Sequence, residues 1–572
     1  MLPQTLDHFQ EIWCVDYEFS AKPGERPEPL CLVAHEYKNG QTLRQWVGQF
    51  EPEPPYNIGK DALFVSYYAP AEFSCHLARG WKLPVYTLDL YTEFRNITNG
   101  HRLPCGRGLL GALAWFGLAS IGASEKAEMR ELALRGGEYS EDEMEALLDY
   151  CHGDVDALVR LLPKMLPHIS LPHALIRGRY MKAVARMEHH GIPIDTVTLE
   201  RLRSQWIDIK DRLITQVDAD YGVFDGQTFK ADRWLSWCQQ VNIPWPLLES
   251  GAPTLDKETF KTLALRYPRV EPIRQLRKTL SELRLHDLTV GEDGRNRCLL
   301  SPYGSKTSRN TPSTSKYVFG PSAWLRGLIK PPEGHSLAYI DWVQQEIGIA
   351  AALSGDSAMI EAYESGDVYT TFAKQAGAVP DDATKQSHLR ERALFKMCML
   401  AVGYGQGSAS LAAAIGRPEE AARQLLRLHH ETYKRFWQWS DAVENHALLT
   451  GQLHTTFDWR LHIVDERPNC RSIRNWPMQS NGAEMLRLAC CLGTDLDIKI
   501  IAPVHDAVLI EAPTDEIGDA VCLMQSCMAL ASRMVLSGFE LRTDAEVTDY
   551  PDRFEDEKGF AMWAQVQDLL QN

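Results

Sequence analysis

Two segments in the second half of the chain combine apolar residues with an acidic residue at one end. The segment 337–340 predicts a strand that leads into Asp341. The segment 499–512, KIIAPVHDAVLIEA, predicts a hairpin of two buried strands with His505 and Asp506 at its turn. Two carboxylates at adjacent strand ends could share a pair of divalent ions, and oxygen ligands suit Mg²⁺. Taken alone, each aspartate is more typical of a solvated turn.

The segment between these two strand ends predicts a helix. In HLRERALFKMCMLAVGYGQG, Arg392, Lys396, Leu400 and Tyr404 recur every four residues, so a helix places them on one stripe. Two cations, an apolar residue and an aromatic residue in this order suit a nucleotide lying along the helix, with its phosphates at the cations. Arginine and lysine four residues apart are also common on solvated helix faces.

The first segment of the chain has a second set of acidic residues. EIWCVDYEF predicts a strand with Asp16 and Glu18 on one face, because residues two apart in a strand point the same way. LLDYCHGDVDAL predicts a helix with Tyr150 and Asp154 four residues apart. Such residues can bind two ions and orient a water molecule for phosphodiester hydrolysis. Taken alone, acidic residues at a strand end are more typical of solvation.

After about residue 165 the pattern changes. MLPHISLPHAL predicts a linker, and RGRYMKAVARMEHHGIPID predicts an amphipathic helix that ends at Gly191 and Pro193. Helical stretches rich in Arg, Lys and Trp continue to about Arg284. We interpret their tryptophans as core residues rather than base-stacking platforms: Trp234, Trp237 and Trp245.

Length and composition fit a protein of several globular domains. The chain has 572 residues, of which 44% are hydrophobic and 24% charged. Its thirteen cysteines form no CxxC pair and no signal peptide is evident, so we expect a reducing cytoplasm and no disulfides. The uncharged run 108–124 is shorter than a membrane-spanning helix and contains glycines, which predicts a buried helix and no membrane.

The charges are unevenly distributed. A net charge of −16 argues against indiscriminate nucleic-acid binding. Residues 271–330 nevertheless hold 11 Lys or Arg against 5 Asp or Glu, whereas residues 511–572 hold 4 against 13. A basic middle and an acidic end suit a clamp on duplex DNA with a solvated outer face, although basic runs are often plain surface.

Three motifs together resemble family A DNA polymerases that carry a proofreading exonuclease. DWVQQE from Asp341 is similar to their first palm motif, RALFKMCMLAVGYG to their fingers helix, and VHDA from Val504 to their second palm motif, in the same order and spacing. The resemblance covers most of 170–572. It implies a multidomain fold of the α/β and α+β classes, with a ribonuclease H-like exonuclease domain over 1–165 and a right-hand polymerase domain over 166–572. Within the latter it implies a thumb at about 195–285, a palm at about 286–355 and 455–572, and fingers at about 356–454.

The first segment resembles the DEDD exonucleases. Their pattern of DxE, a central acid and YxxxD is met by Asp16 and Glu18, then Tyr150 and Asp154. The central acid is Glu72 in FVSYYAPAEF, where the family usually has aspartate, and Asp89 is the second candidate. The resemblance implies 3′–5′ proofreading with four metal ligands: Asp16, Glu18, Glu72 and Asp154.

In the polymerase part, the resemblance implies that Asp341 and Asp506 hold two Mg²⁺, with Mn²⁺ as an alternative ion. Arg392 and Lys396 would neutralise charge as pyrophosphate leaves. Glu346 would hydrogen-bond Tyr404 and block a ribose 2′-hydroxyl, which favours DNA over RNA synthesis. The implied nucleotide-binding residues are Arg392, Lys396, Leu400, Tyr404, Glu346 and Tyr369.

Contacts to primer–template DNA are implied at a further group of residues. Arg471, Asn475 and Gln479 lie four residues apart on one helical stripe, and Pro477 predicts that this helix begins or bends nearby. A capping role for Asn475 is the alternative. The implied DNA-binding residues are Arg309, Arg326, Arg471, Asn475, Gln479 and His505.

Four positions depart from the family pattern. Leu400 replaces an aromatic residue that stacks on the incoming nucleotide, and Tyr369 replaces a histidine; Ala507 replaces a glutamate and Gly348 an arginine. We expect a monomeric, cytoplasmic, nucleoid-associated DNA polymerase of a bacterium or phage that uses dNTPs and lacks a 5′-nuclease. Its processivity factor is not predicted. The alternatives are a single-subunit RNA polymerase and a polymerase-derived binding scaffold.

Overall fold

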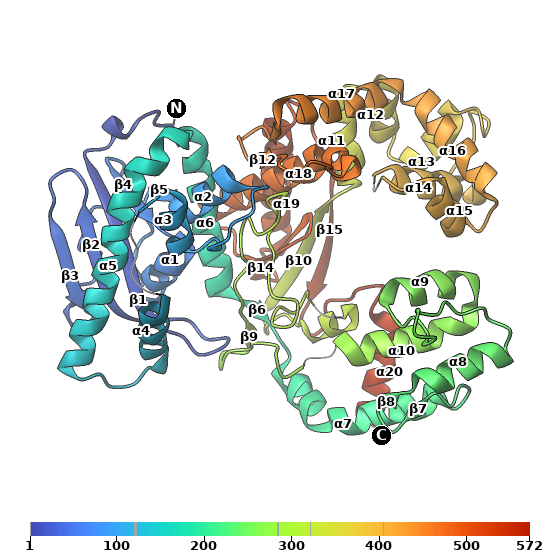
Figure 1. The fold of residues 1–572 in the computed structure, drawn as a ribbon, viewed down its shortest axis with the longest axis horizontal. Helices are drawn as coiled ribbons and strands as arrows, with labels where there is room; N and C mark the ends of the chain where they lie inside the picture. Colours follow the sequence, from blue (N-terminus) through green and yellow to red (C-terminus); the bar gives the residue numbers. More distant parts are fainter. Residues whose placement is uncertain (1, 119–122, 283–284, 321, 404, 572) are drawn as a thin grey trace.

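The computed structural model describes residues 2–571 except 119–122, 283–284, 321 and 404. A five-stranded sheet forms the N-terminal part, at the left of Figure 1, in the order β3-β2-β1-β4-β5. Strand β2 is antiparallel to β1 and β3, while β4 is parallel to β1 and β5. The strands are β1 (Glu11–Ser20), β2 (Glu28–Glu36), β3 (Thr42–Trp46), β4 (Ala62–Ser66) and β5 (Tyr86–Asp89).

Helices cover both faces of this sheet. They are α1 (Ala69–Ala78), α2 (Leu90–Thr98), α3 (Leu109–Trp115), α4 (Ala123–Arg135) and α5 (Glu141–Met165). Alternate residues of β1 therefore enter different cores: Trp13 and Val15 pack in one hydrophobic cluster, and Ile12 and Cys14 in the other. Burial on both faces explains the near-continuous apolar run in this strand.

Helix α6 (Leu171–His190) joins the N-terminal sheet to the rest of the molecule. The predicted linker is wrong over 171–175, because the helix begins at Leu171, directly after its N-cap Ser170. The helix packs against α1, β5 and later parts of the chain, so it is buried on several faces rather than amphipathic. It ends at Gly191, whose φ is +64°. A Cβ on Gly178 would lie 1.9 Å from the Thr87 carbonyl oxygen, so this close contact with β5 requires glycine.

A four-stranded antiparallel sheet lies in the middle of the molecule, in the order β13-β14-β10-β15. Its strands are β10 (His335–Trp342), β13 (Ile500–Val504), β14 (Ala507–Pro513) and β15 (Thr543–Asp549). The helices packed around it are α11 (Gln345–Ser354), α18 (Cys470–Asp495) and α19 (Ile517–Val535). The predicted strand before Asp341 and the predicted hairpin around Asp506 are both confirmed.

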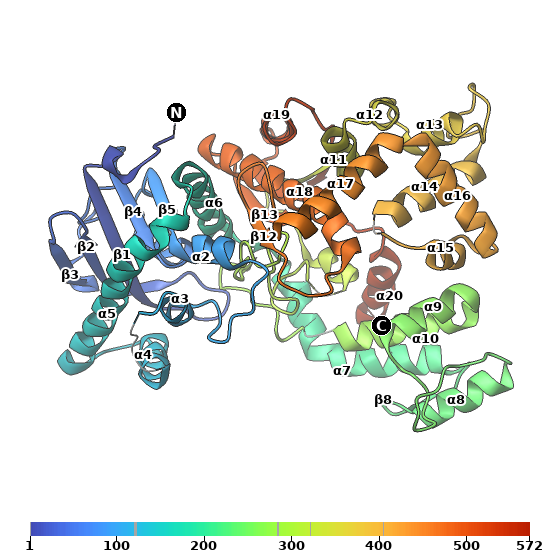
Figure 2. The same cartoon turned by 45° about the horizontal axis from the view of Figure 1, so that its top comes forward.

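Two groups of helices extend to the right of this sheet in Figure 1. The upper group is α12 (Ser357–Glu364), α13 (Val368–Gln375), α14 (Leu389–Gly403), α15 (Ser408–Ile415), α16 (Glu419–Thr432) and α17 (Lys434–Thr450). The lower group is α7 (Thr196–Asp218), α8 (Ala231–Gln240), α9 (Lys257–Arg266), α10 (Glu271–Glu282) and the C-terminal α20 (Phe560–Gln571). Figure 2 shows the two groups from another side. Helix α14 confirms the helix predicted between the two strand ends.

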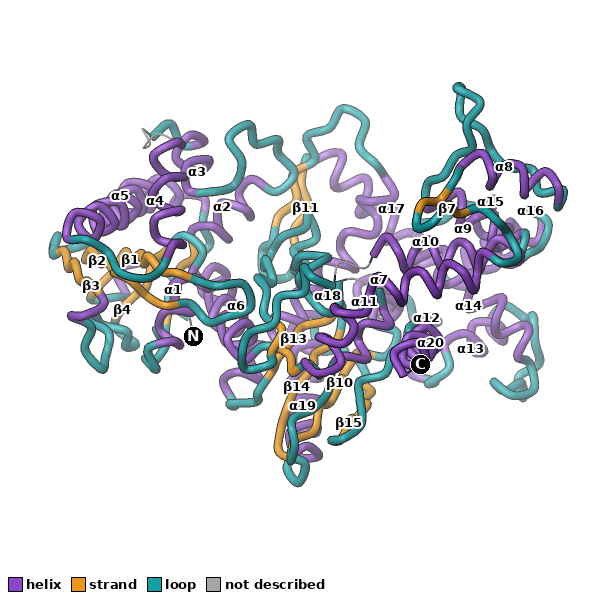
Figure 3. The backbone as a smooth tube through the Cα atoms, turned by 90° about the horizontal axis from the view of Figure 1, so that it is seen from below, coloured by secondary structure: helices purple, strands orange, loops and turns teal. Residues whose placement is uncertain are grey.

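The described residues also form short two-stranded sheets: β6 (Ile192–Pro193) with β9 (Arg295–Asn296), β7 (Phe224–Asp225) with β8 (Thr228–Phe229), and β11 (Gln452–His454) with β12 (Arg460–His462). Figure 3 shows β11 between the N-terminal part and the helices beyond it. The interpretation of the tryptophans in the lower group is confirmed, since Trp234 is fully buried and packs against Trp237, Trp245 and Phe260.

Buried polar contacts hold the N-terminal part against the rest. The Arg177 guanidinium on α6 pairs with Glu93 at 2.6 Å and donates to the Phe457 carbonyl oxygen at 2.9 Å. The Asn96 amide exchanges hydrogen bonds with the backbone of Asp458 and Arg460. All thirteen cysteines are free thiols. Among the described helices, none combines the length and apolar character that a membrane crossing needs.

Candidate active site

Asp341 and Asp506 come together at one end of the central sheet. Asp341, near the end of β10, lies directly opposite Ala507, the first residue of β14. Asp506 precedes Ala507 in the tight turn from β13, in which His505 adopts a left-handed φ of +57°. Both carboxylates line one cavity of about 530 Å³. The sequence prediction that two distant strand ends meet is therefore fulfilled in the fold.

This end of the sheet accumulates negative charge. Burial, together with the carboxylates of Asp506, Asp544 and Glu546, raises the pKa of Asp341 from 3.8 to about 6. Burial also raises the pKa of Asp506, while His505 and Arg309 partly offset this effect. Asp544 and Glu546 belong to β15, whose register places Asp544 directly opposite Asp341. A cation between the carboxylates would relieve this repulsion.

The donor chemistry of this pair fits a divalent ion of the magnesium class. Among the described residues, no group of three or more His, Cys, Asp or Glu side chains is arranged to hold a metal ion. Mg²⁺ typically binds through one or two carboxylates and completes its shell with water and substrate phosphates. Asp341 and Asp506 therefore match a site that is completed by a phosphate-bearing ligand rather than an all-protein cage.

Glu346 extends the site from the first turn of α11. It is half-buried, and burial raises the pKa of its carboxyl group, an effect that Arg309 opposes. The Arg309 guanidinium lies 3.8 Å from the Glu346 carboxylate. The loop that carries Arg309 is fixed by the buried Arg487, which donates to the backbone and hydroxyl oxygens of Ser308. Tyr404, the predicted partner of Glu346, lies outside the described residues.

Helix α14 contributes the predicted nucleotide-binding stripe. Leu400 and Tyr369, from α13, line the cavity together with the two aspartates. Lys396 and Arg392 lie about one and two turns before Leu400 and are not part of the cavity lining. Their cationic groups lie 5.9 and 5.1 Å from the Tyr369 ring centre, and Arg392 Nε donates to both oxygens of Asp367 at 3.0 Å. Tyr369 thus supports the cations from the position where a histidine was expected.

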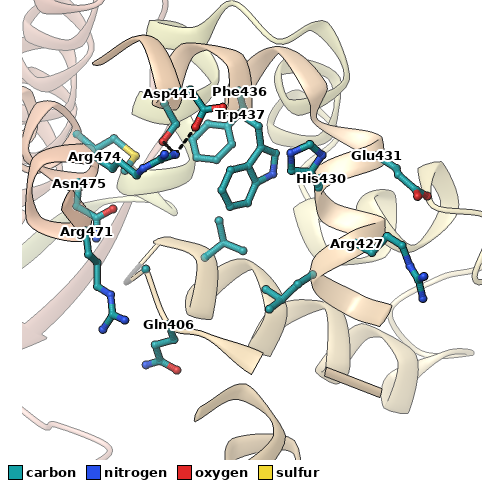
Figure 4. A pocket seen from close by; sticks show the side chains of 15 residues that line it. Gln406, Arg427, His430, Glu431, Phe436, Trp437, Asp441, Arg471, Arg474 and Asn475 are labelled. Carbon is teal, nitrogen blue, oxygen red and sulfur yellow. Dashed lines mark hydrogen bonds and ion pairs between the residues drawn. The ribbon is translucent and has the colours of Figure 1, made fainter. Parts of the chain in front are cut away.

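The predicted DNA-binding residues occupy different surroundings. His505 and Arg309 line the cavity. Arg326 pairs with Asp556 and lies over the Phe319 ring, so its guanidinium is already engaged. Arg471, Asn475 and Gln479 lie on α18, and the first two line a neighbouring cavity (Figure 4).

One predicted helix start and one alternative role on α18 are wrong. The sequence predicts that the helix begins or bends near Pro477; a start at the proline is wrong, because the helix begins seven residues earlier, at Cys470, and runs through Pro477. Asn475 is inside the helix and is not its cap, because Asn469 accepts the hydrogen bond from the Ser472 backbone and caps the helix.

Sequence reasoning missed several residues of this site. Lys558, from the loop before α20, lines the cavity. Burial lowers the pKa of His505, and the positive charges of Arg326, Arg309 and Lys558 add to this effect. The pair between Arg326 and Asp556 holds this loop in place, two residues before Lys558. Gln345 and His429 are buried residues that also line the cavity. A single lysine in an acidic segment carried no sequence signal, since its position depends on a contact with a remote part of the chain.

Comparison with known proteins identifies this part of the chain. Residues 320–549 match the family described as DNA polymerase family A. These residues form a family A DNA polymerase domain. The central sheet, helix α14 and both aspartates lie within it.

Curated relatives support this assignment. DNA polymerase I of Aquifex aeolicus is 24% identical over 453 residues, which cover 71% of this chain and 75% of that protein. DNA polymerase I of Chloroflexus aurantiacus is 23% identical over 69% of this chain, and the thermostable DNA polymerase I of Thermus aquaticus is 24% identical over 47%. The chain spans only 45% and 34% of the latter two proteins.

The fold of the whole chain has a solved counterpart. The POL domain of Pol1 from M. smegmatis, in complex with DNA primer-template and dNTP, superposes with a TM-score of 0.71 at 18% identity. The match covers 95% of this chain and 96% of that chain. The predicted mixed α/β multidomain fold is therefore confirmed. The superposition extends beyond the polymerase domain into the N-terminal sheet.

N-terminal to the polymerase domain, the second predicted set of residues lies close together. Asp16 and Glu18 are on β1, and Tyr150 and Asp154 are on α5, which packs on β1. Burial raises the pKa of the Tyr150 hydroxyl, and the carboxylates of Asp154, Glu18 and Asp16 add to this effect. Because the carboxylates on β1 and α5 affect the pKa of Tyr150, the polar side chains of the strand and the helix lie close together.

Glu72 joins this group, and Asp89 serves another purpose. The buried Glu72 carboxylate on α1 accepts the Tyr17 backbone N–H at 3.0 Å. Burial raises its pKa, and Asp16 and Glu18 raise it further. Asp89 caps α2 by accepting from Thr92 N, and it also accepts from Ala69 N, both at 2.6 Å. Both oxygens of Asp89 are therefore committed to the backbone, which favours Glu72 as the central acid.

Proposed function

We propose that this chain is a DNA-directed DNA polymerase that transfers nucleotides from dNTPs to the 3′-hydroxyl of a primer paired with a template. The observation that carries this proposal is the meeting of Asp341 and Asp506 in one cavity of a family A polymerase domain. When bound by these carboxylates, two Mg²⁺, or Mn²⁺ as an alternative, would supply activation of the attacking oxygen and charge stabilisation at the leaving pyrophosphate.

The residues of the chain supply binding and orientation. Leu400 would contact the base or sugar of the incoming nucleotide. Lys396 and Arg392 follow at about 6 and 12 Å along the helix axis, a spacing that suits an extended triphosphate. Asp367 binds the Arg392 guanidinium, and the Tyr369 ring lies beside it. The cations are therefore held ready for phosphates before the nucleotide arrives.

Glu346 and Arg309 would select the sugar. Their side chains lie 3.8 Å apart in the cavity that contains Asp506. A partly buried carboxylate at this point leaves little room for a 2′-hydroxyl, and Tyr404 is the further member of this gate that we propose. This selection favours DNA synthesis over the alternative of a single-subunit RNA polymerase.

The arrangement of the helices supports the proposed parts of the right hand. In this proposal the central sheet is the palm, the upper helices α12–α17 are the fingers, and the lower helices α7–α10 are the thumb, with the boundaries given by the sequence. Primer–template DNA would contact Arg309, His505 and the α18 stripe of Arg471, Asn475 and Gln479. Arg326 would take part only after release from Asp556. We propose that the enzyme acts as a monomer at the nucleoid.

We also propose 3′–5′ proofreading by the N-terminal part. The acidic group of Asp16, Glu18, Glu72 and Asp154, with Tyr150 beside it, has the oxygen ligands that suit divalent ions and the hydroxyl that suits orientation of a water molecule. Burial raises the pKa values of Glu72 and Tyr150, and the neighbouring carboxylates raise them further, which supports the closeness of these groups.

Primer extension tests the main proposal. We expect the full chain to extend a labelled primer on a DNA template with dNTPs and Mg²⁺, and Asp506→Asn to reduce the rate by several orders of magnitude. Asp515→Asn, an exposed residue on the loop after β14, is the matched control. Extension with NTPs alone would favour the RNA polymerase alternative. DNA binding without extension by the wild-type chain would favour the scaffold alternative.

A further inference from the structure

The loop 304–309, which ends at the cavity residue Arg309, is held in part by helix α2 of the N-terminal sheet. Figure 1 shows α2 directed from that sheet toward β12 and α18, and α2 contacts β12. Asn99, directly after α2, donates from its amide nitrogen to the Lys306 carbonyl oxygen at 2.8 Å and to the Arg460 carbonyl oxygen at 2.7 Å. One side chain of the N-terminal part thus joins the loop to strand β12.

These contacts are shielded from water. Asn99 is only 3% exposed, and its amide nitrogen uses both of its hydrogens. Arg95, one turn earlier on α2, is 5% exposed, and its guanidinium donates to the Gly304 carbonyl oxygen at 2.7 Å. Buried hydrogen bonds are costly to leave unmade. The end of α2 therefore fixes the backbone of the loop at two places, Gly304 and Lys306.

The same loop is also bound from the polymerase domain. The Lys306 carbonyl oxygen accepts from Trp476 Nε1 at 3.0 Å and from Trp459 Nε1 at 3.3 Å. Arg487 donates to the carbonyl and hydroxyl oxygens of Ser308. The loop would therefore stay attached without the bond from α2, so a substitution at the end of α2 can move the loop without unfolding it.

The backbone at Ser308 needs support from its surroundings. Its φ is +61°, in the left-handed region that is unfavourable for residues other than glycine, and the residue is fully buried. Such a conformation persists where the contacts around it over-determine it. Within the loop, the Ser308 and Arg309 backbone N–H groups donate to the Ser305 carbonyl oxygen at 3.0 Å and to Ser305 Oγ at 2.9 Å. A displacement of the loop is therefore passed on to Arg309.

We propose that Asn99 is a positioning residue of the polymerase site, which sets the place of Arg309 through the loop 304–309. The proposal rests on the proposed function, in which Arg309 and Glu346 select the sugar. The Arg309 guanidinium lies 3.8 Å from the Glu346 carboxylate, a separation longer than a direct hydrogen bond. A small shift of the loop would change this pair. The N-terminal part would thus contribute to nucleotide selection, in addition to the hydrolysis proposed at its own acidic group.

Single-nucleotide insertion kinetics with the full chain test the proposal. We expect Asn99→Ala to lower the ratio of kcat/KM for dNTPs over NTPs by about threefold or more, because Arg309 no longer keeps its place beside Glu346. A mere loss of folded enzyme would reduce both values by the same factor and leave the ratio unchanged. An unchanged ratio in Asn99→Ala would overturn the proposal.

Asn96 provides the matched control. Its amide binds the backbone of Asp458 and Arg460 at 2.9 and 2.7 Å, so it joins α2 to β12 as Asn99 does. None of its hydrogen bonds goes to the loop 304–309, all of which the structure describes. We expect Asn96→Ala to keep the wild-type ratio. An equal fall in both variants would assign the effect to docking of the N-terminal part and contradict the role of the loop.

A double-mutant cycle identifies the route of the effect. Arg309→Ala should itself lower the ratio, because it removes the partner of Glu346. If Asn99 acts through Arg309, adding Asn99→Ala to Arg309→Ala should cause no further fall. A further fall of the same size as in the wild-type background would place the effect on another path and refute the proposal.

Hydrogen exchange gives a readout that does not require catalysis. The bonded amides of Ser308 and Arg309 should exchange several-fold faster in Asn99→Ala than in the wild-type chain or in Asn96→Ala, as followed by mass spectrometry. Equal exchange in all three would overturn the support of the loop by α2. Failure of the proposed function differs: the wild-type chain would then extend no primer with either kind of nucleotide, whereas exchange in the loop would still respond to Asn99→Ala.

Discussion

Asp341 on β10 lies directly opposite Asp544 on β15. On its other side, β10 pairs with β14, and the residue opposite Asp341 there is Ala507. The resemblance to family A polymerases leads us to expect a glutamate at position 507, and this carboxylate is absent. The acidic residue beside Asp341 is instead Asp544, on the edge strand β15. This arrangement contributes to the raised pKa of Asp341.

The pH dependence of stability follows from that pKa. Because the folded-state pKa of about 6 exceeds the ordinary 3.8, ionised Asp341 destabilises the metal-free fold above pH 6, and this cost disappears as the pH falls below 4. We expect Asp341→Asn to raise the free energy of unfolding by about 1 kcal/mol at pH 8, after discounting for its half-exposed position, and not at pH 3.5. Urea denaturation in EDTA measures this, with Asp515→Asn as the control. A gain that is equal at both pH values would contradict the assigned cause.

Loss of the Glu346 carboxylate should relax sugar selection. We expect Glu346→Ala to lower the ratio of kcat/KM for dNTPs over NTPs by about tenfold or more, because the space for a 2′-hydroxyl opens beside Arg309. Single-nucleotide insertion kinetics measure the ratio. Glu364→Ala, at an exposed position on α12, should leave it unchanged. Undiminished discrimination in Glu346→Ala would exclude the proposed gate.

An aromatic ring at position 400 should strengthen nucleotide binding. Leu400 lines the active-site cavity, and a stacked ring contributes about 1–3 kcal/mol. We expect Leu400→Phe to lower the KM for dNTPs by at least about fivefold, with Leu400→Met as a non-aromatic control of similar volume. Steady-state extension assays measure the effect. An unaltered KM in Leu400→Phe would show that the base does not lie against this side chain.

Proofreading should depend on the N-terminal carboxylates. We expect Asp16→Ala and Glu72→Gln to abolish removal of a mismatched primer end, because both residues belong to the acidic group between β1, α1 and α5. Extension of a matched primer should persist, and Asp7→Ala should have no effect on either reaction. Gel assays with both primer ends follow the two reactions together. Unimpaired mismatch removal in Asp16→Ala would assign the hydrolysis to another site.

The contact between α6 and β5 should not tolerate a side chain. We expect Gly178→Ala to destabilise the protein by about 2 kcal/mol, since its Cβ would overlap the Thr87 carbonyl oxygen, even though alanine favours a helix. Gly48→Ala is the matched control, because nothing lies within 4 Å of the added Cβ. Thermal denaturation compares the two variants. Equal melting temperatures would mean that the helix moves away without cost.

The sequence by itself determined the local elements of the site. Apolar runs before Asp341 and around Asp506 predicted the strand and the hairpin. The four-residue spacing of Arg392, Lys396 and Leu400 predicted α14. Such patterns depend only on near neighbours in the chain. The three motifs also sufficed to expect a polymerase domain.

Only the tertiary structure decided which of these elements meet. The opposition of Asp341 and Asp544, the entry of Lys558 into the cavity and the engagement of Arg326 by Asp556 each join segments that are distant in the chain. The linker prediction failed at 171–175 for the same reason, since α6 is stabilised by burial against remote strands and helices rather than by its own pattern. Long-range packing is set by the whole fold, and no local period of the sequence encodes it.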